Sequence, residues 1–287
     1  MAAWQDKFWN SADGLRLHYR DYAGPHDRPP LLCIPGLTRN AADFEPFADH
    51  VAGQWRVIAV DLRGRGLSEY ESKPERYVPA VYAADLMKLL DQLGIADAVF
   101  IGTSLGGLVT MVMAATDGER IAGALLNDIG PDIDAEGLDR IAGYVGIDTR
   151  FPDWDGIVAA LKARNGDKFP KWDEATWHRY ARRIAYESGG TIGFAYDMAI
   201  AENFQRARDA PVFDAWPLWR ALAGRPVAVL HGEISDLLST ATTRRMIEEV
   251  PETEVVVIPD VGHTPNLEEP ESLAALDRLL GRVLAAG

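Results

Sequence analysis

The strongest chemical signal in this chain is a serine between two glycines, at the point where an apolar run ends. The run Val99–Ile101 leads into Gly102-Thr103-Ser104-Leu105-Gly106, and a segment of small and apolar residues follows to Ala115. This order predicts a strand, a tight turn and a helix. A serine at such a turn has a strained backbone, so residues two positions away must lack colliding side chains. The helix N-terminus would favour a developing oxyanion. The pattern therefore predicts Ser104 as a nucleophile.

This motif, in its strand and helix context, resembles the nucleophile turn of the α/β-hydrolase superfamily. A second motif, Asp61-Leu62-Arg63-Gly64-Arg65-Gly66, resembles the superfamily's Asp-x-Arg-Gly-x-Gly loop. It lacks the spacing and the Lys-Ser/Thr of a phosphate-binding loop, so we expect it to pack beneath the active site, with contact to substrate left open. The resemblance covers nearly the whole chain apart from one insertion. It implies a Ser–acid–His triad and no metal or organic cofactor.

The resemblance also implies a general base in a loop after the last strand. The pair Gly262-His263 follows the apolar run Val255–Ile258 in such a loop. Serine is a poor nucleophile at its own pKa, and an imidazole can take its proton and return it to the leaving group. We therefore predict His263 as the base.

Four carboxylates compete for the third position of the triad. Asp236 lies a few residues beyond the strand where the family usually places its acid, and it is the predicted partner of His263. Glu233 lies closer to that strand than is usual, and Asp260 is too near His263 in sequence. Asp128, which follows an earlier strand, remains an alternative because some relatives take their acid from that place.

Two backbone amides are predicted to form the oxyanion hole. One belongs to Leu105, directly after the nucleophile, and the other to Leu37, in the loop after an early strand. The family usually has His-Gly at the start of that loop, whereas this chain has Pro35-Gly36. Because the donor is a backbone amide, the departure should spare the hole. What it changes is the set of surrounding hydrogen bonds that the usual histidine makes.

Positioning these groups requires a parallel sheet, whose carboxyl strand ends meet at one edge. Short apolar runs alternate with helical periodicity, as expected for strands buried on both faces. Together with this alternation, the resemblance implies an α/β-hydrolase fold with a mostly parallel eight-stranded sheet flanked by helices. Predicted strands are Leu15–Tyr22 (one strand of a half-exposed hairpin), Leu31–Ile34, Val57–Val60, Val99–Ile101, Ala124–Leu126, Pro226–Leu230 and Val255–Ile258. Predicted helices are Val81–Leu93, Leu105–Ala115, Ala241–Val250 and Pro270–Leu284.

The alternation is interrupted by a segment with helical patterning and no buried-strand run. We predict a core domain from residues 1–130 and 218–287, and a helical cap from residues 131–217 inserted after the sixth strand. Aromatic residues of the cap are expected either to line an apolar pocket or to form the cap's own core. Arg39, beside the oxyanion loop, is either a surface residue or a partner for a substrate carboxylate. The aromatic residues are Tyr144, Trp154, Trp172, Trp177, Phe194, Tyr196 and Phe204.

The residues around the predicted nucleophile and base reduce the number of reaction classes of the superfamily that this chain resembles. Haloalkane dehalogenases and epoxide hydrolases use aspartate where Ser104 stands, proline iminopeptidases have Trp where Leu105 stands, and cofactor-free haloperoxidases have Trp at Leu37. The expected function is a carboxylesterase (EC 3.1.1) acting on a small to medium, partly apolar ester. A lactonase, a thioesterase or a C–C bond hydrolase remains open, although Thr264 replaces the Trp usual in C–C hydrolases. The alternative of another class is a non-catalytic ligand-binding protein of this fold.

Composition sets the remaining limits. The 287 residues carry a formal net charge of -14, so we expect no nucleic-acid partner and no anionic membrane partner. The single cysteine, Cys33, lies in an apolar run and is expected to be a buried thiol. The N-terminal residues lack a secretion signal, and no apolar stretch approaches membrane-spanning length. We expect a cytoplasmic enzyme whose partner is its small-molecule substrate.

Overall fold

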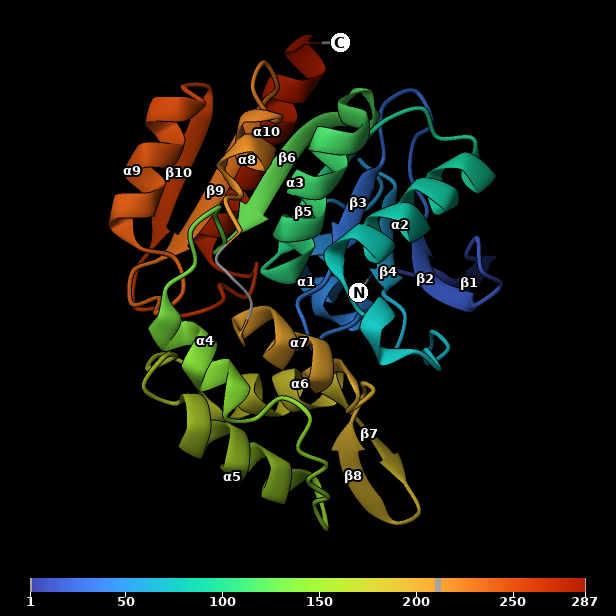
Figure 1. Cartoon of the computed structure of the whole chain (residues 1–287), viewed down its shortest axis with the longest axis vertical. Coiled ribbons are helices and arrows are strands. Elements are labelled where there is room, and N and C mark those ends of the chain that lie inside the picture. Colours follow the sequence, from blue (N-terminus) through green and yellow to red (C-terminus); the bar gives the residue numbers. More distant parts are fainter. Residues whose placement is uncertain (1, 210–212, 287) are drawn as a thin grey trace.

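The computed structural model describes residues 2–209 and 213–286, and within them the main element is a mostly parallel sheet of eight strands (Figure 1). The sheet order is β1-β2-β4-β3-β5-β6-β9-β10. The first two strands are antiparallel to each other, β2 is antiparallel to β4, and the other pairs are parallel. This confirms the predicted fold class. The strands are Trp4–Asn10 (β1), Arg16–Tyr22 (β2), Leu31–Ile34 (β3), Val57–Asp61 (β4), Ala98–Thr103 (β5), Ile121–Asn127 (β6), Val227–Gly232 (β9) and Thr253–Ile258 (β10).

The central strands are buried along their whole length, which explains their continuous apolar sequences. Alternate side chains of β5 enter two different hydrophobic clusters: Phe100 belongs to one, and Val99 and Ile101 to the other. Side chains of successive strand residues point to opposite faces, so each cluster fills the space between one face of the sheet and the helices that cover it. All residues of β3, β4, β5 and β9 are buried.

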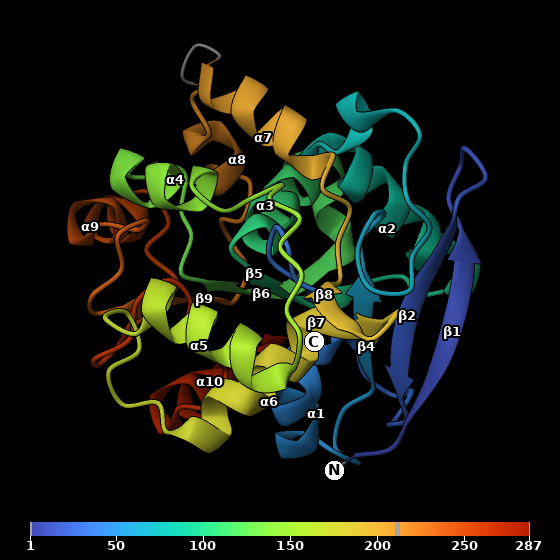
Figure 2. The same cartoon turned by 90° about the horizontal axis from the view of Figure 1, so that it is seen from below.

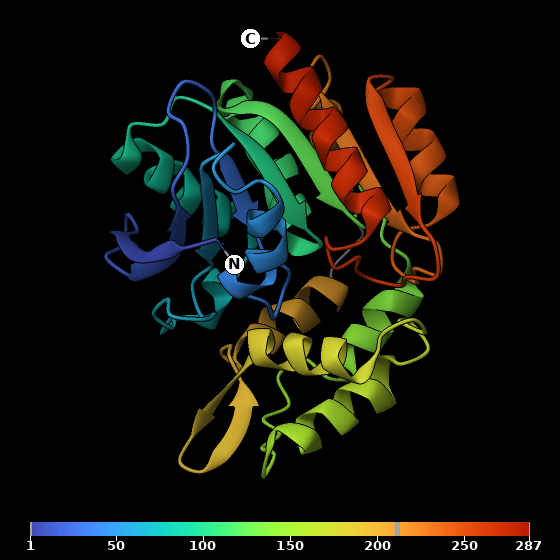
Figure 3. The same ribbon diagram turned by 180° about the vertical axis from the view of Figure 1, so that it is seen from behind.

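Helices cover both faces of the sheet. Apolar residues of α2, α3 and α8 belong to one cluster, whereas those of α1 and α10 belong to the other. Figure 3, seen from behind, shows α10 and α1 on the face opposite to α2 and α3. The helices are Glu45–His50 (α1), Pro79–Leu93 (α2), Leu105–Asp117 (α3), Trp216–Arg220 (α8), Thr240–Glu249 (α9) and Pro270–Ala286 (α10), with 3-10 turns at Ala41–Phe44, Pro74–Arg76 and Gly118–Arg120.

The segment between β6 and α8 lies beyond the carboxyl ends of the parallel strands (Figure 1), and Figure 2, seen from that end, shows α4 and α5 in front of the sheet. Its described residues form four helices, in agreement with the helical patterning, and also a two-stranded antiparallel hairpin that the sequence does not indicate. The division into a core and a cap domain stays a prediction. Among the described residues, no helix combines the length and apolarity needed to cross a membrane. The elements are Ala135–Ala142 (α4), Trp154–Asn165 (α5), Glu174–Ile184 (α6), Ala185–Ser188 (β7), Thr191–Phe194 (β8) and Ile200–Asp209 (α7).

Candidate active site

Ser104 occupies the tight turn between β5 and α3. Its backbone has φ 50° and ψ −113°, an uncommon conformation for a residue with a side chain. A Cβ atom at Gly102 would come within 2.5 Å of the Gly106 carbonyl oxygen, and one at Gly106 would collide with the carbonyl of Ile34. Both glycines are therefore required by close backbone contacts. The strand, turn and helix predicted around the serine are confirmed.

Ser104 and His263 are hydrogen-bonded, and His263 is in turn bonded to Asp128. The distance from Ser104 Oγ to His263 Nε2 is 2.8 Å, and that from His263 Nδ1 to Asp128 Oδ2 is also 2.8 Å. With its proton on Nδ1, His263 donates to Asp128 and accepts from the serine hydroxyl. Three segments far apart in sequence thus meet at the carboxyl edge of the sheet: the β5–α3 turn, the end of β6 and the loop after β10.

Asp128 is held in a dense set of polar contacts. Its Oδ1 accepts from the backbone N–H of Gly232 at 2.8 Å, and its Oδ2 accepts from the Ser235 hydroxyl at 2.6 Å. Burial tends to raise the pKa of Asp128, but interactions with His231, His263 and Ser235 outweigh burial and lower the pKa below its usual value. The carboxyl group is therefore ionised at neutral pH. An ionised, fixed carboxylate can hold the imidazole tautomer and stabilise an imidazolium.

The prediction that Asp236 is the partner of His263 is wrong. The Asp236 carboxylate binds Arg140 of α4 instead, with Nε to Oδ2 at 2.6 Å and Nη2 to Oδ1 at 2.9 Å, and Lys168 lies 3.6 Å away. The physical reason is how the two carboxylates are paired: Asp236 is engaged by the cations Arg140 and Lys168. Asp128, directly after β6, is the carboxylate that contacts the base. The loop after β9 contributes Ser235 rather than its aspartate.

The two predicted oxyanion donors lie close to the nucleophile. Among the described residues, neither the Leu37 nor the Leu105 backbone N–H has a hydrogen-bond partner, so both amides are free to bind a ligand oxygen. Leu37 lines the same pocket as Ser104. A Cβ atom added to Gly36 would lie 3.8 Å from the Ser104 Cβ, which places this loop against the nucleophile. Their role in the reaction stays a prediction.

The loop that follows β4 supports the oxyanion loop from beneath. Arg65, which is fully buried, donates from Nε to the Leu37 carbonyl oxygen at 2.9 Å and from Nη1 to the Tyr82 hydroxyl at 2.9 Å. Asp61 accepts from the Ala41 and Leu67 backbone amides, on two different loops. Neither residue lines the pocket. This arrangement agrees with the expectation of a structural loop beneath the site.

Replacing Arg65 with Met should lower kcat on a neutral ester while changing KM less. The Leu37 carbonyl would lose its fixed orientation, and the neighbouring Leu37 N–H would be less firmly held. Loss of one oxyanion donor costs about 10²–10³-fold in kcat, so partial misplacement of this N–H should cost up to that amount. The measurement is steady-state kinetics, with thermal unfolding to show that the variant is folded at the assay temperature. An unchanged kcat in folded protein would mean that Arg65 does not position the oxyanion loop.

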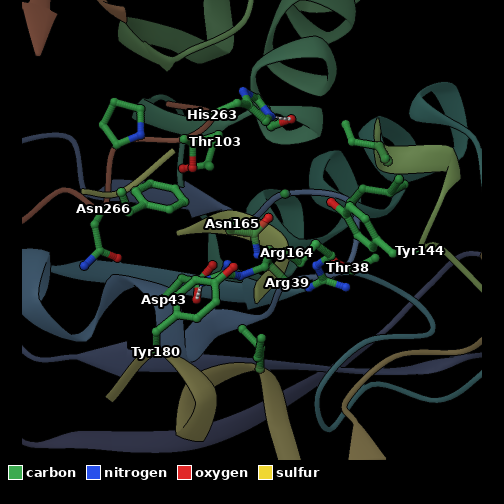
Figure 4. Close-up of a pocket in the computed structure, with 18 of the residues that line it drawn as sticks. Thr38, Arg39, Asp43, Thr103, Tyr144, Arg164, Asn165, Tyr180, His263 and Asn266 are labelled. Atoms are coloured by element: carbon green, nitrogen blue, oxygen red, sulfur yellow. Dashed lines mark hydrogen bonds and ion pairs between the residues drawn. The ribbon is translucent and has the colours of Figure 1, made fainter. Parts of the chain in front are cut away.

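A pocket of about 100 Å³ opens beside Ser104 and His263 (Figure 4). Of the seven aromatic residues proposed for the cap, four line it: Tyr144, Trp172, Phe194 and Tyr196. Trp177 instead packs behind it on Phe169 and Trp172. Trp154 and Phe204 are not among its lining residues. The expectation that the aromatic residues divide between pocket and cap core therefore agrees with their positions.

Charged residues in the same pocket were missed by sequence reasoning, apart from Arg39. Arg140 on α4 and Arg164 on α5 also line it, together with Asp43. Nothing in the sequence indicates which side of a cap helix faces the site, so the pattern alone could not identify them. In the part of the chain that the structure describes, His, Cys, Asp and Glu side chains form no group of three or more that could hold a metal ion.

Comparison with known proteins agrees with this architecture. The sequence profile described as "Alpha/beta hydrolase family" matches residues 31–276. A 3-hydroxybutyrate-oligomer hydrolase of Cupriavidus necator is 32% identical over 267 residues, covering 90% of each chain. A 2-(acetamidomethylene)succinate hydrolase of Mesorhizobium japonicum is 31% identical and covers 85% of this chain and 84% of its own. A crystal structure of an alpha/beta hydrolase from Novosphingobium aromaticivorans is 51% identical, with a TM-score of 0.92, and covers 98% of this chain and 99% of its own.

The chain therefore belongs to the alpha/beta hydrolase family. The first two of these relatives are hydrolases by name, and the structural neighbour is described as one, which supports hydrolase activity for this chain.

Proposed function

We propose that the protein is a serine hydrolase of carboxylic esters, with Ser104 as nucleophile, His263 as general base and Asp128 as the residue that orients it. The observation that carries this proposal is the continuous hydrogen-bonded series from the Ser104 hydroxyl through the imidazole to a buried, ionised carboxylate. Free amides at Leu37 and Leu105 beside the serine support the same reaction.

The reaction follows from this geometry. Ser104 Oγ attacks the ester carbonyl carbon while its proton passes to His263 Nε2, and the amides of Leu37 and Leu105 stabilise the oxyanion. The tetrahedral intermediate then collapses, and the bond between the carbonyl carbon and the alcohol oxygen breaks. The alcohol oxygen takes the proton from His263, and an acyl-serine remains. His263 then removes a proton from water, which attacks the acyl group, and returns this proton to Ser104 Oγ as the bond to the acyl carbon breaks and the carboxylic acid is released.

A small to medium, partly apolar ester fits the pocket. Its volume of about 100 Å³ and its aromatic wall from Tyr144, Phe194 and Tyr196 favour a short acyl chain. The relative from C. necator is named for oligomers of 3-hydroxybutyrate, which are linked by ester bonds. Short hydroxy-acid esters are therefore reasonable first substrates for this chain.

The test measures covalent labelling and turnover on the same preparations. Wild-type protein should react with a fluorophosphonate probe and hydrolyse p-nitrophenyl esters from acetate to butyrate faster than longer ones. Ser104→Ala should do neither. Equal labelling of the wild type and Ser104→Ala would refute the serine-hydrolase proposal and favour a non-catalytic ligand-binding protein. Labelling without ester turnover would direct the search to lactones, thioesters and C–C bonds, which the same nucleophile can attack.

A further inference from the structure

Three arginines line the pocket that contains Ser104, although the chain as a whole has a formal net charge of -14. They come from separate elements: Arg39 from the oxyanion loop, Arg140 from α4 and Arg164 from α5. In Figure 4, Arg39 and Arg164 lie between Tyr180 and Tyr144, away from His263. A positive cluster in an acidic protein requires a local explanation.

Two of these arginines already have a carboxylate partner. Arg39 Nη2 donates to Asp43 Oδ1 at 2.5 Å, and its guanidinium lies 4.3 Å from the Tyr180 ring centroid. Arg140 forms a bidentate pair with Asp236. Their charges are largely balanced within the protein. These two pairs also hold both guanidinium groups in fixed positions at the pocket wall.

Arg164 differs because no carboxylate among the described residues pairs with it. Its guanidinium carbon lies 4.2 Å from the Tyr144 ring centroid and 5.9 Å from that of Phe194, and its buried Nε has no hydrogen-bond partner within residues 2–209 and 213–286. Contact with aromatic faces compensates only part of the cost of removing a guanidinium from water. A complementary anion would supply the missing charge and the missing acceptors.

The three arginines all lie near Tyr144 and interact electrostatically with its hydroxyl. Burial raises the pKa of the Tyr144 hydroxyl, while Arg140, Arg164 and Arg39 each oppose that rise. All three guanidinium groups therefore lie close enough to this tyrosine to influence its charge. An anion bound beside Tyr144 would be in the combined field of all three.

We propose that this pocket recognises an ester that carries a free carboxylate away from the scissile bond, and that Arg164, assisted by Arg39, binds that carboxylate. The inference deepens the proposed function and rests on it in taking an ester as the ligand. Arginine suits this role because its planar guanidinium matches a carboxylate with two parallel hydrogen bonds. The apolar wall of Tyr144, Phe194 and Tyr196 would then contact the chain between the carboxylate and the ester.

The test is a binding measurement that needs no turnover. Two probes are titrated calorimetrically into Ser104→Ala at pH 7: the linear ester dimer of 3-hydroxybutyrate, which is an anion, and its neutral methyl ester. The anion is expected to bind at least about tenfold more tightly, the size typical of a hydrogen bond to a charged group. In the Ser104→Ala background, Arg164→Met should reduce the ratio of the two affinities towards one, and Arg164→Lys should retain part of the preference for the anion.

Arg206→Met is the matched control, because it removes the same charge from α7 at a residue with 59% side-chain exposure outside the pocket. It should leave the ratio unchanged. Equal binding of the two probes, binding of neither, or an equal loss of both in Arg164→Met would overturn the carboxylate assignment. Ester turnover by wild-type protein together with equal binding would leave the proposed function standing. Selective binding of the carboxylate without Ser104-dependent turnover would contradict the proposed ester hydrolysis and support the proposed anion site.

Discussion

Asp128→Asn should lower kcat for ester hydrolysis by about 10⁴-fold, the loss seen when a triad aspartate becomes asparagine. The amide of asparagine can donate to His263 Nδ1, which favours the tautomer that carries its proton on Nε2. That tautomer cannot accept the proton of Ser104. The loss should appear in kcat more than in KM, because the carboxylate does not line the pocket. Steady-state kinetics on a short p-nitrophenyl ester measures it.

Asp236→Asn is the natural control for this prediction, since the family pattern favours that residue. Its carboxylate pairs with Arg140 rather than with the base, so the substitution should have only a small effect on the turnover of a neutral ester. A loss in Asp236→Asn as large as that in Asp128→Asn would show that the hydrogen-bonded geometry misidentifies the acid. Circular dichroism and thermal unfolding of both variants would separate catalytic losses from misfolding.

Ser104→Ala should have the largest effect of any single substitution, about 2 × 10⁶-fold in kcat. Removing the hydroxyl removes the covalent route, and what remains is acceleration by the oxyanion amides and by binding, about 10³–10⁴-fold over water. Because the serine and the imidazole act as a unit, adding His263→Ala should cause little further loss. The measurement is kcat for the two single variants and the double variant on one ester.

The outcome that would contradict this prediction is additivity. If the double variant lost the product of the two single losses, Ser104 and His263 would be acting independently. Their 2.8 Å hydrogen bond would then not be the proton-transfer contact. Trace contamination by wild-type enzyme sets the floor of such assays, so titration with the fluorophosphonate probe should accompany each rate.

Sequence reasoning located the central strands well because of where they lie. Strands β3 and β4 are buried on both faces, which produces uninterrupted apolar runs bounded by polar or Gly/Pro residues. Elements with mixed exposure were harder to find. The residues of β1 were not located although its hairpin was expected, and the hairpin β7–β8 was missed altogether. Three of the four residues of β7 are exposed, so its sequence carries no buried-strand signal.

The acid of the site shows a different limit of sequence reasoning. Asp236 has the sequence position that the family resemblance favours, and only the side-chain contacts show that Asp128 is the partner of His263 while Asp236 pairs with Arg140. The pair Ser235 and Asp236 is instructive, because the hydroxyl of the first binds the Asp128 carboxylate while the carboxylate of the second turns to α4. Sequence spacing identified a loop that contacts the acid through Ser235, but the acid itself comes from the end of β6.

Two of the three residues proposed for the triad have left-handed backbone conformations, with φ of 50° at Ser104 and 56° at Asp128. Such a conformation costs a residue with a side chain about 1–3 kcal/mol, and the total stability of a folded protein is only about 5–15 kcal/mol. Glycine at either position would relieve this strain but would remove a side chain that the proposed reaction uses. Stability and turnover are therefore opposed at these two positions.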